Sequence, residues 1–510
     1  MIKNVKWLLL VSLTFVACSE DDEVVKYNST DGLPLTAGTA NFSKFVSLGN
    51  SLTAGFSDNA LFIEGQKGSY TNILAQQFAL VGGGEYKIPF MADNIGGFNS
   101  GGVQIPQFGP RLFFNGAAPV TVPGISGTSI SAVLSGGFNN MGVPGAKSFH
   151  LVTPGYGTLN PYFGRFASSA SASVLGDATA QAPTFFSLWI GNNDVLSYAT
   201  SGGIGVNQLG NLNPATYSGN DITDPNVFAS VYSSLLDGLT AGGAKGVVAN
   251  IPYVTSVPFF TTVPTNPIPG LPNANATSLN QLFGGINAAL AGAGLPARYV
   301  TLLANDGNPA TVEANPLLIV DEALINISTQ ITAALTPVYG APTATFLGGL
   351  LGRTRHASNA PGSRDYILLT ARGVIGTTTV SAPAPFNTVG VSFPMQDNTT
   401  LTAAETLEVK TATDAYNAAI QSLATTKGLA FVDANAVLNQ VANGGISANG
   451  FIVTSGFVTG GGFSLDGVHP SPRGYALIAN KFLEAINAKY GSNLKGVSFG
   501  DYRILFPAQL

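Results

Sequence analysis

The chain has 510 residues, and 45% of them are hydrophobic, enough to bury a sizeable core. Charged residues make up only 10%, against about 25% in an average soluble protein, and the formal net charge is −5. Phosphate binding needs clustered lysine and arginine, and no Lys/Arg-rich block follows the first seven residues. The composition therefore argues against a nucleic-acid partner.

The first 17 residues have the pattern of a secretion signal. Lys3 and Lys6 precede a mostly apolar run from Trp7 to Ala17, which is too short to span a bilayer because a helix needs about 20 residues for that. The ending Phe15-Val16-Ala17-Cys18 resembles a bacterial lipobox, in which the cysteine is lipidated and becomes the mature N-terminus. We therefore expect a signal peptide over 1–17 and a lipid anchor on Cys18, the only cysteine of the chain. The alternative is an ordinary secretion signal with an incidental cysteine.

Residues 18–40 begin with the acidic run Ser19-Glu20-Asp21-Asp22-Glu23 and continue rich in Thr, Gly and Pro, as a flexible tether does. The acidic run resembles tags that route lipoproteins to the outer face of the cell in certain bacteria; the alternative is a solvated spacer. The expected location is the cell envelope, at the outer membrane. The sequence does not decide between its periplasmic and its external face.

From residue 41 the pattern alternates between short apolar strands and amphipathic helices. We expect strands at 42–48, 184–190, 245–252 and 429–433, and helices at 69–80, 224–239, 401–426 and 472–490. The interruption between 259 and 399 contains two further helical segments, at 278–290 and 316–335. Such alternation predicts a parallel sheet covered on both faces, with functional groups at the carboxyl ends of its strands.

Two clusters of residues suit nucleophilic catalysis. Ser51 follows the first strand in the tight turn Gly49-Asn50-Ser51-Leu52, which exposes its hydroxyl beside free backbone N–H groups. Taken alone, such a turn is common. Asp466-Gly467-Val468-His469 precedes the last helix, and among the three histidines only His469 has a carboxylate at this spacing in a Gly/Pro-shaped turn. The imidazole can take the serine proton, and the carboxylate can fix its tautomer.

Two further clusters offer donors for an oxyanion. Asn193, in Gly191-Asn192-Asn193-Asp194, follows a strand and can donate from its amide. Gly145, in Asn140-Met141-Gly142-Val143-Pro144-Gly145-Ala146, can bring a backbone N–H close to a substrate oxygen because no side chain intervenes. Each of these clusters alone is equally typical of a plain turn.

The four clusters in this order resemble the SGNH hydrolases, the GDSL esterase and lipase superfamily. The resemblance covers about 42–259 and 400–490 and implies a flavodoxin-like three-layer αβα sandwich over 41–510, with insertions at about 82–139 and 260–399. It makes Ser51, Asp466 and His469 the catalytic triad and Ser51, Gly145 and Asn193 the oxyanion hole. Asn50 stands where the family has an aspartate, which implies a changed hydrogen bond and not an inactive enzyme.

The expected function is a serine ester hydrolase of the esterase or lipase type, without a metal or another cofactor. The membrane-tethered, low-charge and Phe-rich chain (31 Phe against 2 Trp) favours acyl-chain substrates, with the insertions as lid and acyl-chain groove. Two alternatives stay open: a carbohydrate O-acetyl esterase acting on acylated glycans, and a non-catalytic surface lipoprotein that binds glycan or lipid. A loop with Arg353 and Arg355 could hold an anionic head group or simply be solvated.

Overall fold

The structure is a computed structural model that describes residues 32–308 and 310–510. The expected signal peptide, Cys18 and the greater part of the tether lie outside the described residues. Within these two ranges, no helix is long and apolar enough to cross a membrane.

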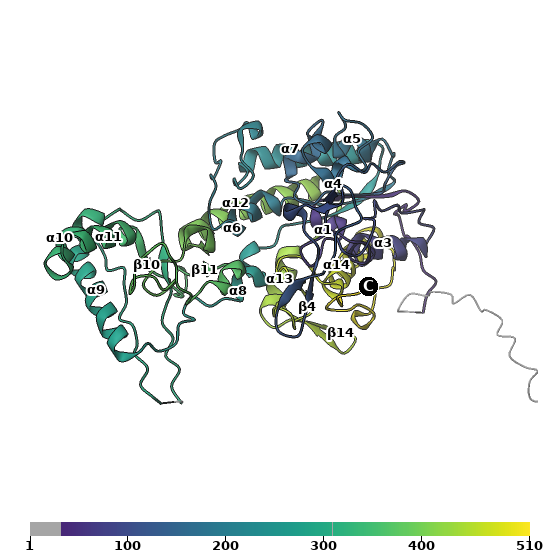
Figure 1. Ribbon diagram of the computed structural model, residues 1–510. Coiled ribbons are helices and arrows are strands. Elements are labelled where there is room, and N and C mark those ends of the chain that lie inside the picture. Colours follow the sequence, from purple (N-terminus) through teal and green to yellow (C-terminus); the bar gives the residue numbers. More distant parts are fainter. Residues whose placement is uncertain (1–31, 309) are drawn as a thin grey trace, which may run out of the picture.

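A five-stranded parallel sheet forms the centre of the molecule (Figure 1). Its strands are β1 (Phe45–Gly49), β6 (Asn140–Gly142), β7 (Phe185–Trp189), β8 (Lys245–Ala249) and β13 (Ala430–Val432). They lie in the order β6-β1-β7-β8-β13, which is 2-1-3-4-5 along the chain and is a common doubly wound order. The expected parallel sheet is thereby confirmed. The sequence pattern gave four of these strands, and β6 was missed because it has only three residues at the end of an irregular stretch.

Helices cover both faces of this sheet, as the alternating pattern predicts. The helices α3 and α14 pack together on one face, and α5, α6, α7 and α12 pack together on the other. Their bounds are α1 (Ser51–Ala54), α2 (Ile63–Lys67), α3 (Tyr70–Ala79), α4 (Pro161–Gly164), α5 (Val174–Thr179), α6 (Asn193–Thr200), α7 (Pro225–Thr240), α12 (Ala403–Thr426), α13 (Ala434–Ala442) and α14 (Pro472–Tyr490). One continuous hydrophobic core joins the sheet to these helices.

The long helices begin where side chains satisfy their first N–H groups. Asp224 accepts from the N–H groups of Asn226 and Val227 at the start of α7, and Ser471 accepts from Gly474 N–H at the start of α14. Thr402 and Glu405 form a reciprocal capping box on α12. These caps explain why the predicted starts of the three helices agree with the observed ones to within two residues.

The 82–139 stretch is mostly irregular, as expected, and carries two small hairpins. These are β2 (Asn99–Ser100) with β3 (Val103–Gln104), and β4 (Leu112–Phe114) with β5 (Pro119–Thr121). A third hairpin, β14 (Ile446–Ala448) with β15 (Phe451–Val453), lies near the C-terminal end of the chain.

The 260–399 segment projects to one side of the sheet domain and has hydrophobic clusters of its own (Figure 1, left). It contains α9 (Asn273–Gly292), β9 (Leu318–Val320), α10 (Ser328–Tyr339), α11 (Ala341–Leu351), β10 (Thr354–His356) and β11 (Tyr366–Ile367), and it is preceded by α8 (Pro258–Thr261). β11 pairs with β12 (Thr400–Leu401), directly before α12. The predicted helix at 316–335 is wrong in its first part, because the apolar run there pairs as β9 with β10 and α10 starts only at Ser328.

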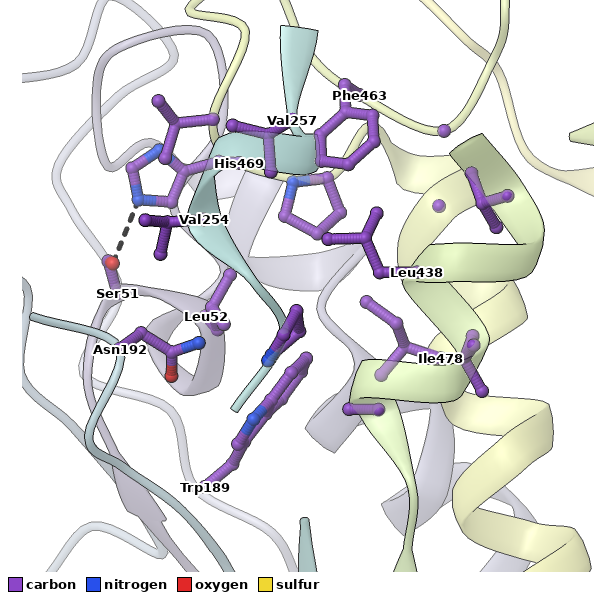
Figure 2. A pocket seen from close by; sticks show the side chains of 18 of the residues that line it. Ser51, Leu52, Trp189, Asn192, Val254, Val257, Leu438, Phe463, His469 and Ile478 are labelled. Carbon is purple, nitrogen blue, oxygen red and sulfur yellow. Dashed lines mark hydrogen bonds between the residues drawn. The ribbon is translucent and has the colours of Figure 1, made fainter. Parts of the chain in front are cut away.

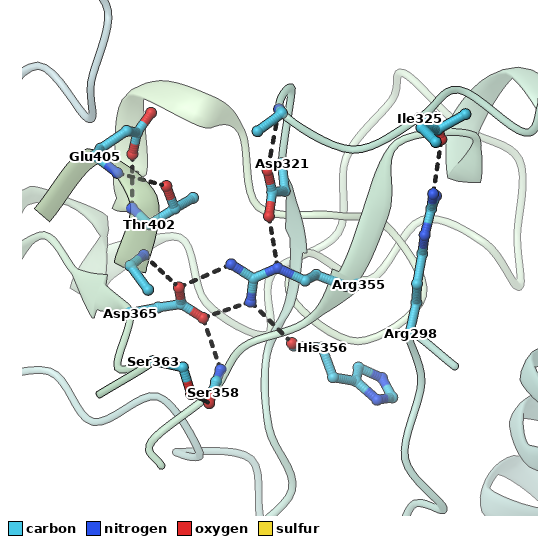
Figure 3. Close-up of polar contacts among 12 residues, drawn as sticks. Arg298, Asp321, Ile325, Arg355, His356, Ser358, Ser363, Asp365, Thr402 and Glu405 are labelled. Carbon is cyan, nitrogen blue, oxygen red and sulfur yellow. Dashed lines mark hydrogen bonds and ion pairs between the residues drawn. The ribbon is translucent and has the colours of Figure 1, made fainter. Parts of the chain in front are cut away.

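Arg355 of β10 joins this segment to α12 (Figure 3). Its guanidinium contacts Asp321 at 2.6 Å and holds the fully buried Asp365 at 2.6 and 2.8 Å. Asp365 in turn accepts from Ala403 N–H, at the first position of α12, at 3.0 Å. Arg355 is therefore neither solvated nor open to an anionic head group, because two carboxylates already occupy its donors.

Candidate active site

The register of the central strands places three loops side by side. Gly49, the last residue of β1, pairs with Gly142 of β6 on one side and with Trp189 of β7 on the other. The residues that follow each strand, 50–51, 143–146 and 190–193, therefore leave the sheet at the same edge. Carboxyl ends of neighbouring parallel strands form the usual ligand crevice of such sheets.

Ser51 occupies the first position of the short helix α1. Asn50 caps this helix, since its Oδ1 accepts from Leu52 N–H at 3.0 Å while its Nδ2 donates to Asn192 Oδ1 at 3.3 Å. A Cβ on Gly49 would come within 2.2 Å of Thr53 Oγ1, so the turn needs glycine there. At the first helical position no residue of the helix can accept from the Ser51 N–H, and this donor has no other acceptor in the described part of the chain.

The three residues of the expected triad form one hydrogen-bonded chain (Figure 2 shows its first link). Ser51 Oγ lies 2.8 Å from His469 Nε2, and His469 Nδ1 lies 2.8 Å from Asp466 Oδ2. Ser51 is 7% exposed and the His469 side chain 15% exposed, so the pair is sheltered but reachable. Residues 418 positions apart in the chain are thus brought into direct contact.

Asp466 is held as a carboxylate by its surroundings. Burial raises its pKa, but the His469 imidazole and the N–H groups of Val468 and His469, both at 2.8 Å, outweigh burial and lower the pKa to about 2. Asn59 N–H donates to the same oxygen as the imidazole, at 3.0 Å. An ionised carboxylate only accepts, so His469 Nδ1 carries the proton and Nε2 is free to accept from the Ser51 hydroxyl.

The other two histidines play structural parts. His150 Nδ1 accepts from Lys147 N–H at 3.0 Å, and His356 Nδ1 accepts from Val300 N–H at 3.0 Å. Burial lowers the pKa of each to about 4, aided at His150 by the nearby Lys147 charge. Both imidazoles are therefore neutral hydrogen-bond acceptors within the fold, and neither contacts a serine hydroxyl of the residues that the structure describes.

The two expected oxyanion donors lie in adjoining loops. Asn193 begins α6, and its Nδ2 donates to the carbonyl of Ala146, next to Gly145, at 2.9 Å. That bond uses one of the two amide hydrogens and leaves the other free. Gly145 adopts φ +80°, and its N–H has no acceptor in 32–308 or 310–510. Gly142 is no rival, because its N–H is already bonded to Asn140 Oδ1 at 2.9 Å.

Two aspartates that the sequence analysis did not single out brace this site. Asp194 accepts from Ser148 N–H at 2.8 Å and Ser148 Oγ–H at 2.7 Å, which fixes the loop that carries Gly145. Asp58 accepts from Leu465 N–H at 2.9 Å and so fixes the loop that carries Asp466. Asp194 is the last residue of the Gly-X-Asn-Asp cluster, so its position was a usable signal. Asp58 lies 407 positions from its partner and has no such signal.

A cavity opens beside Ser51 (Figure 2), and the empty space between its walls, together with the solvent at its open mouth, amounts to about 860 Å³. Its polar lining is confined to Ser51, Asn50, Asn192, Asn193 and His469, and its other walls are mainly aliphatic side chains of 252–257, α13 and α14. None of its lining residues comes from 82–139 or 260–399. The expectation that the insertions form the groove at the nucleophile is therefore wrong for this cavity, which is lined by the strand-end loops, by 252–257 and by the C-terminal part of the chain from 434 to 478.

A group of three carboxylates lies elsewhere, where the 260–399 segment meets α12. Glu322, Asp397 and Glu405 bring one oxygen each to within 4.8 Å of one another, a separation at which three carboxylates could hold a metal ion. Burial and the neighbouring carboxylate of Glu322 raise the pKa of Asp397 to about 7 and that of Glu405 to about 8. The sequence showed no cluster with ligand spacing because these residues are far apart in the chain. None of them lines the cavity at Ser51.

Comparisons with protein-family models, with curated proteins and with solved structures gave no match to this chain.

Proposed function

We propose that this chain is a serine ester hydrolase that works by acyl transfer through Ser51, His469 and Asp466. The observation that carries the proposal is the pair of 2.8 Å contacts from Ser51 Oγ to His469 Nε2 and from His469 Nδ1 to Asp466 Oδ2. A serine hydroxyl becomes a nucleophile at neutral pH only when a positioned base takes its proton. The unpaired N–H groups beside it supply what the charged intermediate needs.

The proposed reaction has two halves. Ser51 Oγ attacks the ester carbonyl carbon as His469 takes the hydroxyl proton, and the carbonyl oxygen becomes an oxyanion facing the N–H groups of Ser51 and Gly145 and the Asn193 amide. The C–O bond to the alcohol breaks, and His469 returns the proton to the leaving alkoxide. Water then attacks the acyl-enzyme in the same way and releases the acid, and Ser51 regains its proton. Asp466 stays ionised throughout and stabilises the imidazolium.

We also propose that the fold is that of the SGNH hydrolases. The 2-1-3-4-5 strand order, the serine after the first strand and the Asp-X-X-His turn before the last long helix support the SGNH hydrolase fold with its three αβα layers. Asn50 departs from the family pattern, and here it still caps α1. The assignment to an SGNH-type enzyme rests on this strand order and these residues alone.

The test is a comparison of the wild-type chain with Ser51→Ala on a panel of esters. We expect the variant to lose about 10⁴-fold or more of kcat, since the residual activity of such sites comes from binding and the oxyanion donors only. A fluorophosphonate probe, which reacts only with an activated serine, should label the wild type and not the variant. Equal ester hydrolysis by both proteins would exclude this mechanism, and absence of labelling in the wild type would favour the non-catalytic binder.

We propose further that the enzyme is anchored to the cell envelope at the outer membrane through a lipid on Cys18. The basic start, the short apolar run and the lipobox-like ending support this proposal. Replacing Cys18 with alanine should move the protein from the membrane fraction to the soluble fraction of the envelope. An unchanged membrane fraction would contradict lipid anchoring.

A further inference from the structure

The cavity beside Ser51 is polar only at the nucleophile. At that end lie Ser51, His469 and Asn193, and the walls beyond them are aliphatic and aromatic carbon. Figure 2 shows Leu438 and Ile478 on the side opposite Ser51 and His469, with Trp189 and Phe463 between them along the walls. Among the described residues, no carboxylate, lysine or arginine lines the cavity. A sugar ring would leave its hydroxyls without partners there, and unpaired buried polar groups are costly.

The helices that form the far wall are held firmly. Leu438 lies on α13, which starts at the Asp433 cap, and Ile478 lies on α14, whose neighbours Leu477 and Phe482 are buried in the main core. Trp189 is 3% exposed, and its indole N–H donates to Asn250 O at 3.1 Å. The far wall is therefore part of the folded core, and it fixes the depth of the cavity measured from Ser51.

The reaction determines which half of an ester needs such a cavity. The alcohol leaves as soon as the acyl-enzyme forms, whereas the acyl group stays bonded to Ser51 Oγ until water releases it. An apolar chamber that begins at Ser51 Oγ therefore serves the acyl chain through both halves of the reaction.

We infer that this cavity binds the hydrocarbon chain of a fatty-acyl ester, and that Leu438 and Ile478 set the longest chain that fits. The inference rests on the proposed esterase function and deepens it, because it selects lipid acyl esters over acetylated glycans. The far wall of the site belongs to the C-terminal helices, and none of its lining residues comes from the long insertions. The enzyme would distinguish acyl chains by length, because a longer acyl chain buries more aliphatic surface until its end contacts Leu438 and Ile478.

The test uses the full-length protein and a series of p-nitrophenyl esters with straight acyl chains from acetyl to lauroyl. Each ester is used below its micelle-forming concentration. We expect kcat/KM to rise about fourfold per added methylene until the far wall is reached, which is the factor for burying one CH₂ group. Leu438→Trp and Ile478→Trp should move the maximum to shorter chains and lower the ratio of decanoyl to acetyl hydrolysis about tenfold or more. Leu438→Ala should move the maximum to longer chains.

Leu407→Trp is the matched control, because Leu407 lies on α12 with 63% of its surface exposed and outside the cavity. It should leave the chain-length profile unchanged. A second series, acetate esters of alcohols of increasing length, should show no comparable rise. A wild-type profile that falls steadily from acetyl onward would overturn the inference without any variant, and so would a maximum that depends on alcohol length.

Fluorophosphonate labelling separates this inference from the proposed function. A wild type that labels at Ser51 but shows no acyl-length preference keeps the hydrolase and removes the acyl cavity. A wild type that does not label at all removes the function itself. Each tryptophan variant should label at Ser51, which shows that it has folded; if one does not, the alanine variant and the wild-type profile still decide the inference.

Discussion

The carboxyl-end loops of the sheet and the 260–399 segment arrange their polar side chains in different ways. At the sheet edge, the N–H groups of Ser51 and Gly145 and one hydrogen of the Asn193 amide have no acceptor in the described part of the chain. In the 260–399 segment, Arg355 directs its Nε and both terminal nitrogens at the carboxylates of Asp321 and Asp365. One region keeps donors free beside an open cavity, and the other uses its donors for internal contacts.

Under the proposed function, this difference is the one expected between a catalytic site and a region that maintains structure. Unpaired donors are costly in a fold unless a ligand or an intermediate supplies the missing acceptor. Arg355 directs most of its donors at two carboxylates and at the carbonyl of His356, and the two carboxylates balance its charge, so an anionic ligand gains little there. The comparison therefore predicts that changes at the sheet edge alter activity with little effect on folding, and that changes around Arg355 do the reverse.

The largest expected effect is at Asp466. Asp466→Asn removes the carboxylate that fixes the His469 tautomer, so kcat should fall by about 10⁴-fold. The free energy of unfolding should fall by less, because the charge is lost but the amide oxygen can still accept from the N–H groups of Val468 and His469. Steady-state kinetics on a short-chain ester and a thermal melt measure the two quantities. Asp433→Asn, at the cap of α13, is a control at another aspartate and should keep most of the activity. If the free energy of unfolding fell by as much as the activation free energy rose, the contrast between the two regions would be contradicted.

The next effect is on the stability of the 260–399 segment. Arg355→Met leaves Asp365, which is fully buried, without its cation, and removing one partner of a buried pair typically costs about 3–5 kcal/mol. We expect faster hydrogen exchange in β9, β10 and the start of α12, with hydrolysis of short esters retained because no residue of this segment lines the cavity at Ser51. Arg353→Met is the control, since Arg353 is exposed and donates to the backbone of Glu322 at 3.1 Å.

A third prediction concerns how stability depends on pH through Asp58, a structural residue at the sheet edge that braces the loop carrying Asp466. Burial raises the pKa of Asp58 to about 7, opposed by the Leu465 N–H and reinforced by Asp466. A carboxyl whose pKa is higher in the folded than in the unfolded state stabilises fully below about pH 4, and that contribution is lost as the pH rises through about 7.

Wild-type stability should therefore fall between about pH 4 and about pH 8, and Asp58→Asn should flatten the part of that fall below about pH 7. Glu405, whose pKa burial raises to about 8, acts in the same direction, so adding Glu405→Gln should flatten it further. Thermal melts across this pH range measure the effect. Parallel curves for wild type and Asp58→Asn would show that Asp58 does not titrate there.

The same contrast explains what the sequence could predict. The helix caps at Asp224, Thr402 and Ser471 are local signals, and so are the strand-end clusters around Ser51 and His469. The contacts that support the site and the 260–399 segment could not be predicted from local sequence. Asp58 contacts Leu465 only through tertiary packing. The same holds for Arg355 with Asp321 and Asp365. The run at 317–320 is apolar enough for a helix or a strand, and only its pairing with β10 decides between them.

The smallest expected effect is at Asn50, where the chain departs from the pattern of the family proposed for it. Its Oδ1 caps α1, and its Nδ2 donates to Asn192 Oδ1 at 3.3 Å. An aspartate keeps the cap, and a rotated Asn192 amide can donate to it, so Asn50→Asp should change kcat by no more than a few-fold. Asn50→Ala removes the cap from the helix that carries Ser51, a loss of about 0.5–2 kcal/mol, and should lower kcat further than the aspartate does. Kinetics on one short ester and thermal melts of both variants separate the cap from the contact with Asn192. Equal losses in the two variants would mean that the donor to Asn192, and not the cap, positions the nucleophile.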